Sequence, residues 1–295
     1  MGLLTTRMRN KKLFILLVLC LGLFVYAQAQ PLVSYLGPQG TYSQEACQVF
    51  FGQDGTFIPF ESVKSAVEAL AGGKSDYAVI PQENTIGGAV IDYVDVLISH
   101  KEVFVTGEVE LPITQNLLAL PGTKLSDIKE VYSHKQGIIQ GKEWMSKNIP
   151  NAKVIEVAST AAGAKLVAEK KNPACAAISS AACAGVYGLE IIAPSIQNSN
   201  SNKTRFYVLS LKEPAEEPAE RLAFIVTGKA EELPALMSEM KKKKMTLVTI
   251  HDRPKKTELG EYHYLIECTG SYKSCKKLVG KSSFDFRYLG SFIVR

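Results

Sequence analysis

The chain has 295 residues, with 46% hydrophobic and 21% charged side chains, which are ordinary values for a globular protein. Its formal net charge is +5, but residues 1–29 hold four of the 34 cations and no acid, so the rest of the chain is near +1, with 30 cations against 29 acids. The basic balance therefore gives no reason to expect nucleic-acid binding.

Residues 1–29 have the pattern of a secretory signal peptide. A basic start precedes the 15-residue apolar run LFILLVLCLGLFVYA, and Ala27 and Ala29 occupy the −3 and −1 positions of a cleavage site before Gln30. The run is short for a membrane-spanning helix, which needs about 20 apolar residues. We expect export to the periplasm or beyond, with no membrane attachment after cleavage. A membrane-tethered protein and a cytoplasmic protein with an unused leader are the alternatives.

Residues 30–105 alternate between short β-rich runs and helical patterns, which predicts a parallel α/β sheet. Thr41 or Ser43 is expected to cap the first helix by accepting from backbone N–H groups. The expected strands are LVSYLG, TFIPF and YAVIP, and the expected helices lie in PQGTYSQEACQVFFG, SVKSAVEALAGGK and VIDYVDVLISH. A long extended stretch, residues 103–120, then reads as a crossing to a second lobe.

The second lobe repeats this alternation, and the chain then returns to the first lobe. Its expected strands are EVYSH, KVIEV and CAAISS, and its expected helices are GIIQGKEWMSK and STAAGAKLVAEK. TRFYVLSLK is the expected return strand. The prediction is a catalytic or binding region over residues 30–211, with one lobe at about 30–105 with 190–211, the other at about 106–189, and a cleft between them.

The Pro- and Glu-rich segment KEPAEEPAER, residues 212–221, is a predicted linker. Residues 222–295 then follow the order βαββαβ, which predicts a small ferredoxin-like domain. Five cysteines remain after the leader, an odd number without metal-site spacing, so neither a disulfide framework nor a zinc site is indicated. Cys268 and Cys275 are a candidate disulfide in an exported protein.

Polar clusters stand where the predicted strands end and helices begin. In α/β lobes ligands collect at such points, and helix N-termini suit anions. An anionic small molecule between the lobes fits this placement. The clusters are Gly37–Thr41 with Ser43, Glu83–Thr85, Ser133–Gln136, Ser159–Thr160, and Thr204–Arg205, which opens a strand instead.

The assembly of these motifs resembles the prephenate dehydratase family. The motifs occur in the family order over residues 32–211, as GPQGTYS (37–43), IPQENTIGG (80–88), SHKQ (133–136), STAAGA (159–164) and TRF (204–206). The C-terminal part resembles an ACT regulatory domain, which in this family binds phenylalanine. The resemblance implies a two-lobed catalytic region like a type II periplasmic binding protein, followed by the ACT domain over residues 222–295.

The resemblance also implies the reaction, the decarboxylating dehydration of prephenate to phenylpyruvate in phenylalanine biosynthesis, with no metal or organic cofactor. Thr204 is then the hydrogen-bond donor or general acid for the leaving hydroxyl. The remaining catalytic candidates are Arg205, Glu83, Asn84 and Gln136. The candidate substrate-binding residues are Thr41, Ser43, Asn84, Ser133, His134, Gln136, Thr160, Arg205 and Phe206. Capping or structural roles remain open for Arg205, Glu83, Ser133, His134 and Thr160.

Two departures from the family pattern bear on function. The family usually has Pro after the His of SHKQ, and here Lys135 adds a cation. In the ACT domain, the usual Gly-Ala-Leu and Glu-Ser-Arg-Pro become Pro234-Ala235-Leu236 and His251-Asp252-Arg253-Pro254. Because Pro lacks the backbone freedom of Gly, we expect phenylalanine regulation to be weakened or lost, while the domain still supports a homodimer or homotetramer.

Three other functions compete with this prediction. An arogenate dehydratase would use the same chemistry on an amine in place of the keto group. A prephenate decarboxylase without dehydration is disfavoured by the intact TRF motif. An extracytoplasmic solute-binding protein suits the leader and the cleft but not the ordered motifs.

Overall fold

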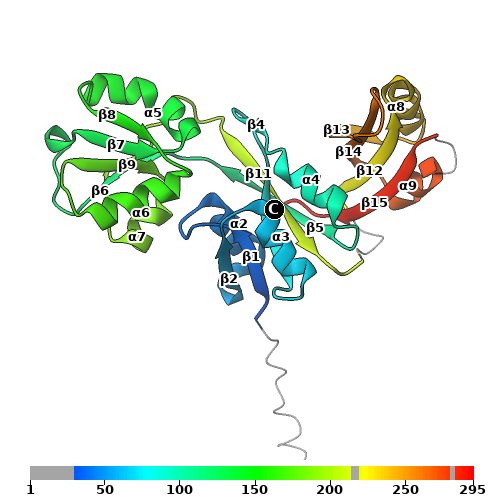
Figure 1. Cartoon of the computed structure of the whole chain (residues 1–295), viewed down its shortest axis with the longest axis horizontal. Coiled ribbons are helices and arrows are strands. Elements are labelled where there is room, and N and C mark those ends of the chain that lie inside the picture. The colour runs from blue at the N-terminus through cyan, green and yellow to red at the C-terminus, as the bar shows by residue number, and fades with distance from the viewer. Residues whose placement is uncertain (1–29, 214–218, 280–282) are drawn as a thin grey trace, which may run out of the picture. The chain divides into compact units, whose positions relative to one another are not determined.

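The computed structural model describes residues 30–213, 219–279 and 283–295. The predicted leader, and residues 214–218 of the predicted linker, lie outside the described residues. Pro31–Arg295 form one compact unit with three β-sheets (Figure 1). Within the described ranges, no helix combines the length and the apolar character needed to cross a membrane.

The first sheet contains the return strand β11 between β3 and the edge strand β5. Its order is β2-β1-β3-β11-β5, with β4 paired to β3, and β11 runs antiparallel to both of its neighbours. The strands are β1 (Leu32–Leu36), β2 (Thr56–Phe60), β3 (Tyr77–Asn84), β4 (Gly88–Ala89), β5 (Phe104–Pro112) and β11 (Lys203–Ser210). The helices are α2 (Tyr42–Phe51), α3 (Val63–Ala71) and α4 (Asp92–Ser99), with a short 3₁₀ turn η1 (Gly52–Asp54).

Local sequence explains these elements. β3 begins with a fully apolar run that is buried, as expected for a strand covered on both faces. α3 begins at a capping box, in which Ser62 accepts from the Ser65 backbone and the Ser65 side chain accepts from the Ser62 backbone. The predicted cap of α2 is wrong, because the Thr41 side chain makes no capping bond. Its hydroxyl instead donates to the carbonyls of Leu36 and Pro38, at 3.1 and 3.0 Å.

The second sheet forms the other predicted lobe, with the order β10-β6-β9-β7-β8. Its strands are β6 (Asn116–Ala119), β7 (Glu130–Ser133), β8 (Lys153–Glu156), β9 (Cys175–Ser179) and β10 (Glu190–Ala193). The helical elements are η2 (Leu125–Asp127), α5 (Lys135–Asn148), α6 (Thr160–Lys170) and α7 (Ala182–Tyr187). Ser159 caps α6 by accepting from the Ala162 backbone at 3.0 Å.

The pairing of β5 and β10 within their sheets places both crossings between the lobes later in the chain than predicted. All of β5 pairs with β11, so the first crossing lies after Pro112 rather than near residue 105. β10 pairs with β6, so the second crossing follows Ala193 rather than residue 189. The sequence did not mark these points, because an extended run carries no signal of which sheet supplies its partner.

The third sheet belongs to the C-terminal domain, with the order β13-β14-β12-β15 and antiparallel pairing throughout. The elements are β12 (Arg221–Lys229), η3 (Ala230–Glu232), α8 (Leu233–Lys242), β13 (Thr246–Pro254), β14 (Glu261–Thr269), α9 (Tyr272–Val279) and β15 (Asp285–Phe292). The predicted βαββαβ order is therefore confirmed. Cys268 and Cys275 are free thiols in the core under α8 and α9, so the candidate disulfide is not formed.

The other face of the third sheet packs on the first sheet and α4. Ala223, Ile225 and Leu265 share a buried core with Tyr93 of α4 and Tyr207 of β11. Beyond β15, the C-terminal residues pair with β5, where the Glu108 N–H donates to the Ile293 carbonyl at 3.1 Å. The return strand β11 thus lies close to the C-terminal domain as well as to the crossing between the lobes.

Candidate functional site

Strands β3 and β11 bring Asn84 and Thr204 together. The two residues are directly opposite each other in the antiparallel ladder. Asn84 Nδ2 donates to Thr204 Oγ1 at 2.8 Å, and both side chains are largely buried. Two of the predicted catalytic residues are therefore in direct contact.

The orientation of the Asn84 amide is fixed by its other end. Its Oδ1 accepts from the backbone N–H groups of Ile86 and Gly87, at 3.0 and 2.8 Å. Because Oδ1 faces two donors, the nitrogen must be the atom that faces Thr204. Thr204 Oγ1 therefore accepts from Asn84, and its own O–H is not used in that hydrogen bond. Accepting this bond also polarises the hydroxyl and makes it a better donor.

Asn202 is a residue of this site that the sequence patterns did not mark. It is 1% exposed, and its Oδ1 accepts from Asn84 Nδ2 at 2.8 Å and from the Thr85 hydroxyl at 3.2 Å. The backbones of Thr85 and Lys203 add a 2.9 Å hydrogen bond beside it. The polar run NSNSN suggested only a solvated loop. The one feature that could have indicated a role for Asn202 is its position, an amide two residues before Thr204.

A pocket of about 330 Å³ lies between the turn after Asn84 and the N-terminus of α5. Its lining residues are Ile86, Gly87, His134, Lys135, Gln136, Ile139 and Glu156. A Cβ added to Gly87 would lie 1.8 Å from Gln136 Nε2, so only glycine lets this side chain approach. His134 caps α5, its Nδ1 accepting from the Gln136 backbone at 3.3 Å. His134 and Gln136, two of the predicted substrate-binding residues, therefore both line this pocket.

Other predicted binding residues hold the scaffold instead. Ser133 is fully buried and donates to the Ile178 carbonyl at 2.7 Å. Thr160 opens α6, and its methyl group lies near Gly137 beneath α5. Ser43 is buried on α2, and Phe206 is 2% exposed in the core between the first sheet and α2. In this structure Ser133 and Phe206 have no surface to offer a ligand.

Arg205 and Glu83 lie away from Thr204, which corrects the prediction that they share its site. Successive residues of a strand point to opposite faces, so the pair Arg205 and Glu83 faces away from the pair Thr204 and Asn84. Arg205 makes a two-pronged bond to Glu108, with both N···O distances 2.8 Å, and lies 3.4 Å from Glu83. Burial lowers the pKa of Arg205, but the hydrogen bonds to Glu108 and the nearby carboxylates raise it by more, so the pKa lies above its ordinary value. It is engaged by protein carboxylates rather than free for a substrate carboxylate.

Comparison with known proteins identifies the family of this chain. The family model for prephenate dehydratase matches residues 33–214. The chain belongs to the prephenate dehydratase family. It is 31% identical over 269 residues to the bifunctional chorismate mutase/prephenate dehydratase of Aquifex aeolicus, covering 88% of this chain and 73% of that protein. It is 30% identical to the prephenate dehydratase of Lactococcus lactis, covering 83% of this chain and 89% of that one.

A solved structure extends the similarity to the fold. The crystal structure of prephenate dehydratase from Arthrobacter aurescens, in complex with L-Phe, superposes with a TM-score of 0.80 at 30% identity. The match covers 89% of this chain and 90% of that one. The similarity therefore includes the C-terminal domain as well as both lobes.

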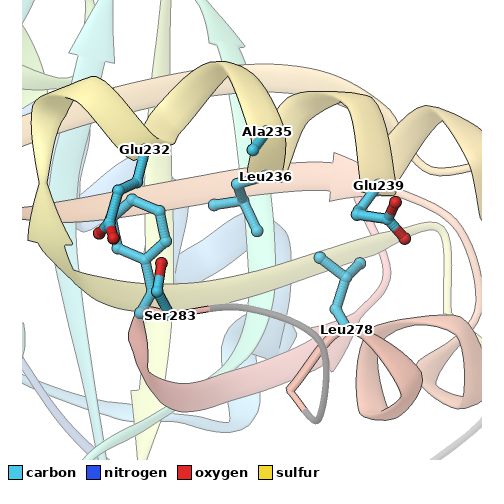
Figure 2. Close-up of a pocket in the computed structure, with 7 residues that line it drawn as sticks. Glu232, Ala235, Leu236, Glu239, Leu278 and Ser283 are labelled. Atoms are coloured by element: carbon cyan, nitrogen blue, oxygen red, sulfur yellow. The ribbon is translucent and has the colours of Figure 1, made fainter.

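The predicted regulatory residues of this family member fall into two separate places. Pro234, Ala235 and Leu236 begin α8, and the last two line a pocket of about 70 Å³ (Figure 2). Its other lining residues are Glu232, Glu239, Leu278, Ser283 and Phe284. The segment His251–Pro254 lies on β13 and does not line this pocket.

Two residues of that segment contact the catalytic region. Arg253 makes a two-pronged ion pair with Asp95 of α4, at 2.6 and 3.0 Å. His251 Nδ1 is hydrogen-bonded to the Tyr93 hydroxyl, and burial lowers the pKa of this histidine. Within the described residues, the predicted effector-binding set is not assembled into one cavity.

Proposed function

We propose that this chain converts prephenate to phenylpyruvate, with Thr204 as the hydrogen-bond donor to the leaving oxygen. One observation carries the proposal beyond family membership. The Asn84 amide donates to Thr204 Oγ1, so the Thr204 proton is available to an incoming acceptor. Asn84 links Thr204 to the pocket, because its Oδ1 binds the backbone of Ile86 and Gly87 at the pocket wall. A buried, oriented hydroxyl is suited to stabilise charge that develops on an oxygen.

The reaction makes limited demands on the protein. The bond from the ring to its carboxylate breaks and releases CO₂, the electron pair moves into the ring, and the C4–O bond breaks. The oxygen leaves as hydroxide, stabilised by the Thr204 hydroxyl, and takes a proton from solvent to become water. Because the ring becomes aromatic, the driving force is large, and the help for the poor leaving group is what the site must supply.

The pocket beside Asn84 suits the rest of the substrate. Prephenate carries two carboxylates, and Lys135 and the N-terminus of α5 place positive charge at the pocket. Ile86 and Ile139 supply apolar walls for the ring. Gln136 lies against Gly87, so it orients groups at the mouth of the cavity next to the Asn84 turn.

The test is turnover by the purified chain, with prephenate and arogenate compared side by side. We expect phenylpyruvate from prephenate, and we expect Thr204→Ala to lower kcat by at least about 100-fold, as for loss of one donor in an oxyanion site. Thr227→Ala is the matched control, because Thr227 lies on β12 and bonds His263. Binding of prephenate without turnover by the wild-type chain would instead indicate a solute-binding protein.

We also propose that the C-terminal domain is an ACT domain whose response to phenylalanine is weakened or lost. Pro234 stands where the family has Gly, and His251 and Arg253 are engaged by Tyr93 and Asp95. Titration calorimetry with phenylalanine, paired with inhibition assays, tests this. Binding in the micromolar range with inhibition would contradict it.

Location and assembly are further proposals from the sequence. The leader pattern supports export, and the C-terminal domain supports a homodimer or homotetramer. N-terminal sequencing of the protein from each cell fraction tests the first, with cleavage before Gln30 expected. Light scattering on the purified protein tests the second.

A further inference from the structure

A carboxylate of the C-terminal domain reaches into the strands that carry the site. Glu267 lies on β14 and is fully buried. One of its oxygens is bound by Arg205, and the other accepts from Gln82 Nε2 at 3.0 Å and from the Tyr207 hydroxyl at 2.7 Å. One side chain of β14 therefore holds residues of both β3 and β11.

These contacts fall on an irregularity in the β3–β11 ladder. Phe206 is opposite Pro81, but Arg205 is opposite Glu83, so Gln82 is an extra residue on β3. Such a bulge shifts every pairing beyond it by one position and re-aims the side chains there. Glu267 binds the bulged residue itself.

The bulge decides which side chain faces Thr204. With the register that runs from Val208 to Phe206 continued unbroken, Thr204 would be opposite Glu83. The extra residue Gln82 moves the pairing by one, and Asn84 takes that place. The Asn84–Thr204 hydrogen bond thus depends on the bulge being kept.

We propose that Glu267 is a positioning residue for the reaction, acting through Gln82 and Arg205 to keep Asn84 opposite Thr204. The inference rests on the proposed function of Thr204. Glu267 fits this role because a buried carboxylate requires several donors, and three of its donors are supplied by the two strands of the site. Arg221 of β12 lies 3.2 Å away and supplies further positive charge.

The surrounding charges favour a tightly held arrangement. Arg205 is bound by both Glu108 and Glu267, and all three side chains are at least 87% buried, with Glu108 and Glu267 completely so. A buried ion network of this kind tolerates little movement, because any lost contact leaves a charge unpaired. Arg205 is therefore a rigid link between β14 and the residue next to Thr204.

The test compares Glu267→Gln with Asp95→Asn. In either orientation the amide nitrogen of Glu267→Gln faces donors that it cannot accept from, either Arg205 or the pair Gln82 and Tyr207. Asp95→Asn weakens a different contact between α4 and the C-terminal domain. We expect Glu267→Gln to lower kcat about tenfold or more with KM within about twofold, and Asp95→Asn to leave both near wild type. Circular dichroism and thermal melting establish that each variant is folded.

A double-mutant cycle separates positioning from general damage. If Glu267 acts through Thr204, Glu267→Gln causes no further loss in a Thr204→Ala background, whereas an unspecific structural defect lowers the residual rate again. Equal losses in both backgrounds, or wild-type kcat in Glu267→Gln, would overturn the proposal while leaving Thr204 chemistry intact.

Crystal structures of wild type and Glu267→Gln give a readout independent of turnover. We expect the distance from Asn84 Nδ2 to Thr204 Oγ1 to be near 2.8 Å in wild type and beyond hydrogen-bonding range in the variant. An unchanged distance would overturn the proposal even if prephenate is not the substrate. Absence of turnover by wild type, with the distance changed in the variant, would overturn the proposed function alone.

Discussion

Thr204 and Arg205 are neighbours on β11, but they point to opposite faces whose surroundings differ in charge. On the Thr204 face, the neutral amides of Asn84 and Asn202 and the hydroxyl of Thr204 form short hydrogen bonds, and Asn84 also binds the turn that lines the pocket. On the Arg205 face, a cation is buried among carboxylates from β3, β5 and β14. On the first face the Thr204 hydroxyl proton remains available to an acceptor. On the second face Arg205 is engaged by protein carboxylates and is not available to a ligand.

This difference explains why one motif contains both residues. A neutral donor pair can be left partly unsatisfied until a substrate arrives, at modest cost. A buried charge needs its partners at all times, so the Arg205 network is suited to fix geometry rather than to bind ligand. Changes on the two faces are therefore expected to separate into effects on folding and effects on kcat.

The largest expected effect is on stability, from Arg205→Ala. Removing the cation leaves Glu108 and Glu267 buried without their main partner, which costs about 3–5 kcal/mol. Lys203→Ala is the matched control, because its ion pair with Glu110 spans 3.7 Å at the surface and is worth at most about 1 kcal/mol. Urea unfolding of the two variants measures the difference. Similar midpoints for both would show that the Arg205 network is not structural.

On the opposite face, Asn84→Asp is expected to lower kcat by about 100-fold or more. The introduced carboxylate has the same shape as the amide but cannot donate, so the Thr204 proton would turn to that carboxylate instead of the substrate. Asn172→Asp is the control, because the Asn172 oxygen already acts as an acceptor, for the Ala174 backbone. Steady-state kinetics with prephenate measure both. A near-normal rate for Asn84→Asp would remove the basis for the Thr204 assignment.

A smaller loss, about tenfold in kcat, is expected for Asn202→Ala, because Asn202 acts on Thr204 only through Asn84. Asn200→Ala in the same loop is the comparison, since Asn200 is exposed and bonds only Gln197 among the described contacts. If both variants behave alike in the assay, the loop serves only as a connection.

The smallest effect concerns pH. The pKa of Glu108 is raised to about 7, because burial and the nearby Glu267 carboxylate raise it by more than the Arg205 hydrogen bonds lower it. The folded state then holds the proton more tightly than the unfolded state, so this contribution to stability is complete below about pH 4.5 and is lost as pH rises through about 7. We expect the melting temperature of Glu108→Gln, relative to that of wild type, to rise as pH increases from about 5 to about 8. Glu110→Gln, on the same strand but partly exposed, is expected to follow wild type.

Much of the fold could be predicted from the chain alone. Apolar runs such as YAVIP and capping residues such as Ser62 and Ser159 mark strands and helix starts locally, and the βαββαβ order followed from the same patterns. The crossings between lobes near Pro112 and Ala193 were misplaced. Pairing partners decide them, and an extended segment does not encode its partner.

The site divides in the same way. The motifs identified Thr204, Asn84, His134 and Gln136 as a set, because their residue types and order are written in the sequence. The separation of Arg205 from Thr204 follows from strand alternation, but its partners do not. Glu108 and Glu267 are 97 and 62 residues away from Arg205 along the chain.

The sequence by itself determined the family, the chemistry that Thr204 can supply and the succession of strands and helices, since these depend on residue type and short-range spacing. Only the tertiary structure decided that Asn84 rather than Glu83 lies opposite Thr204. That choice rests on one extra residue in β3, and the side chain that holds the extra residue comes from another domain. Register is a property of paired strands, so no single strand contains it.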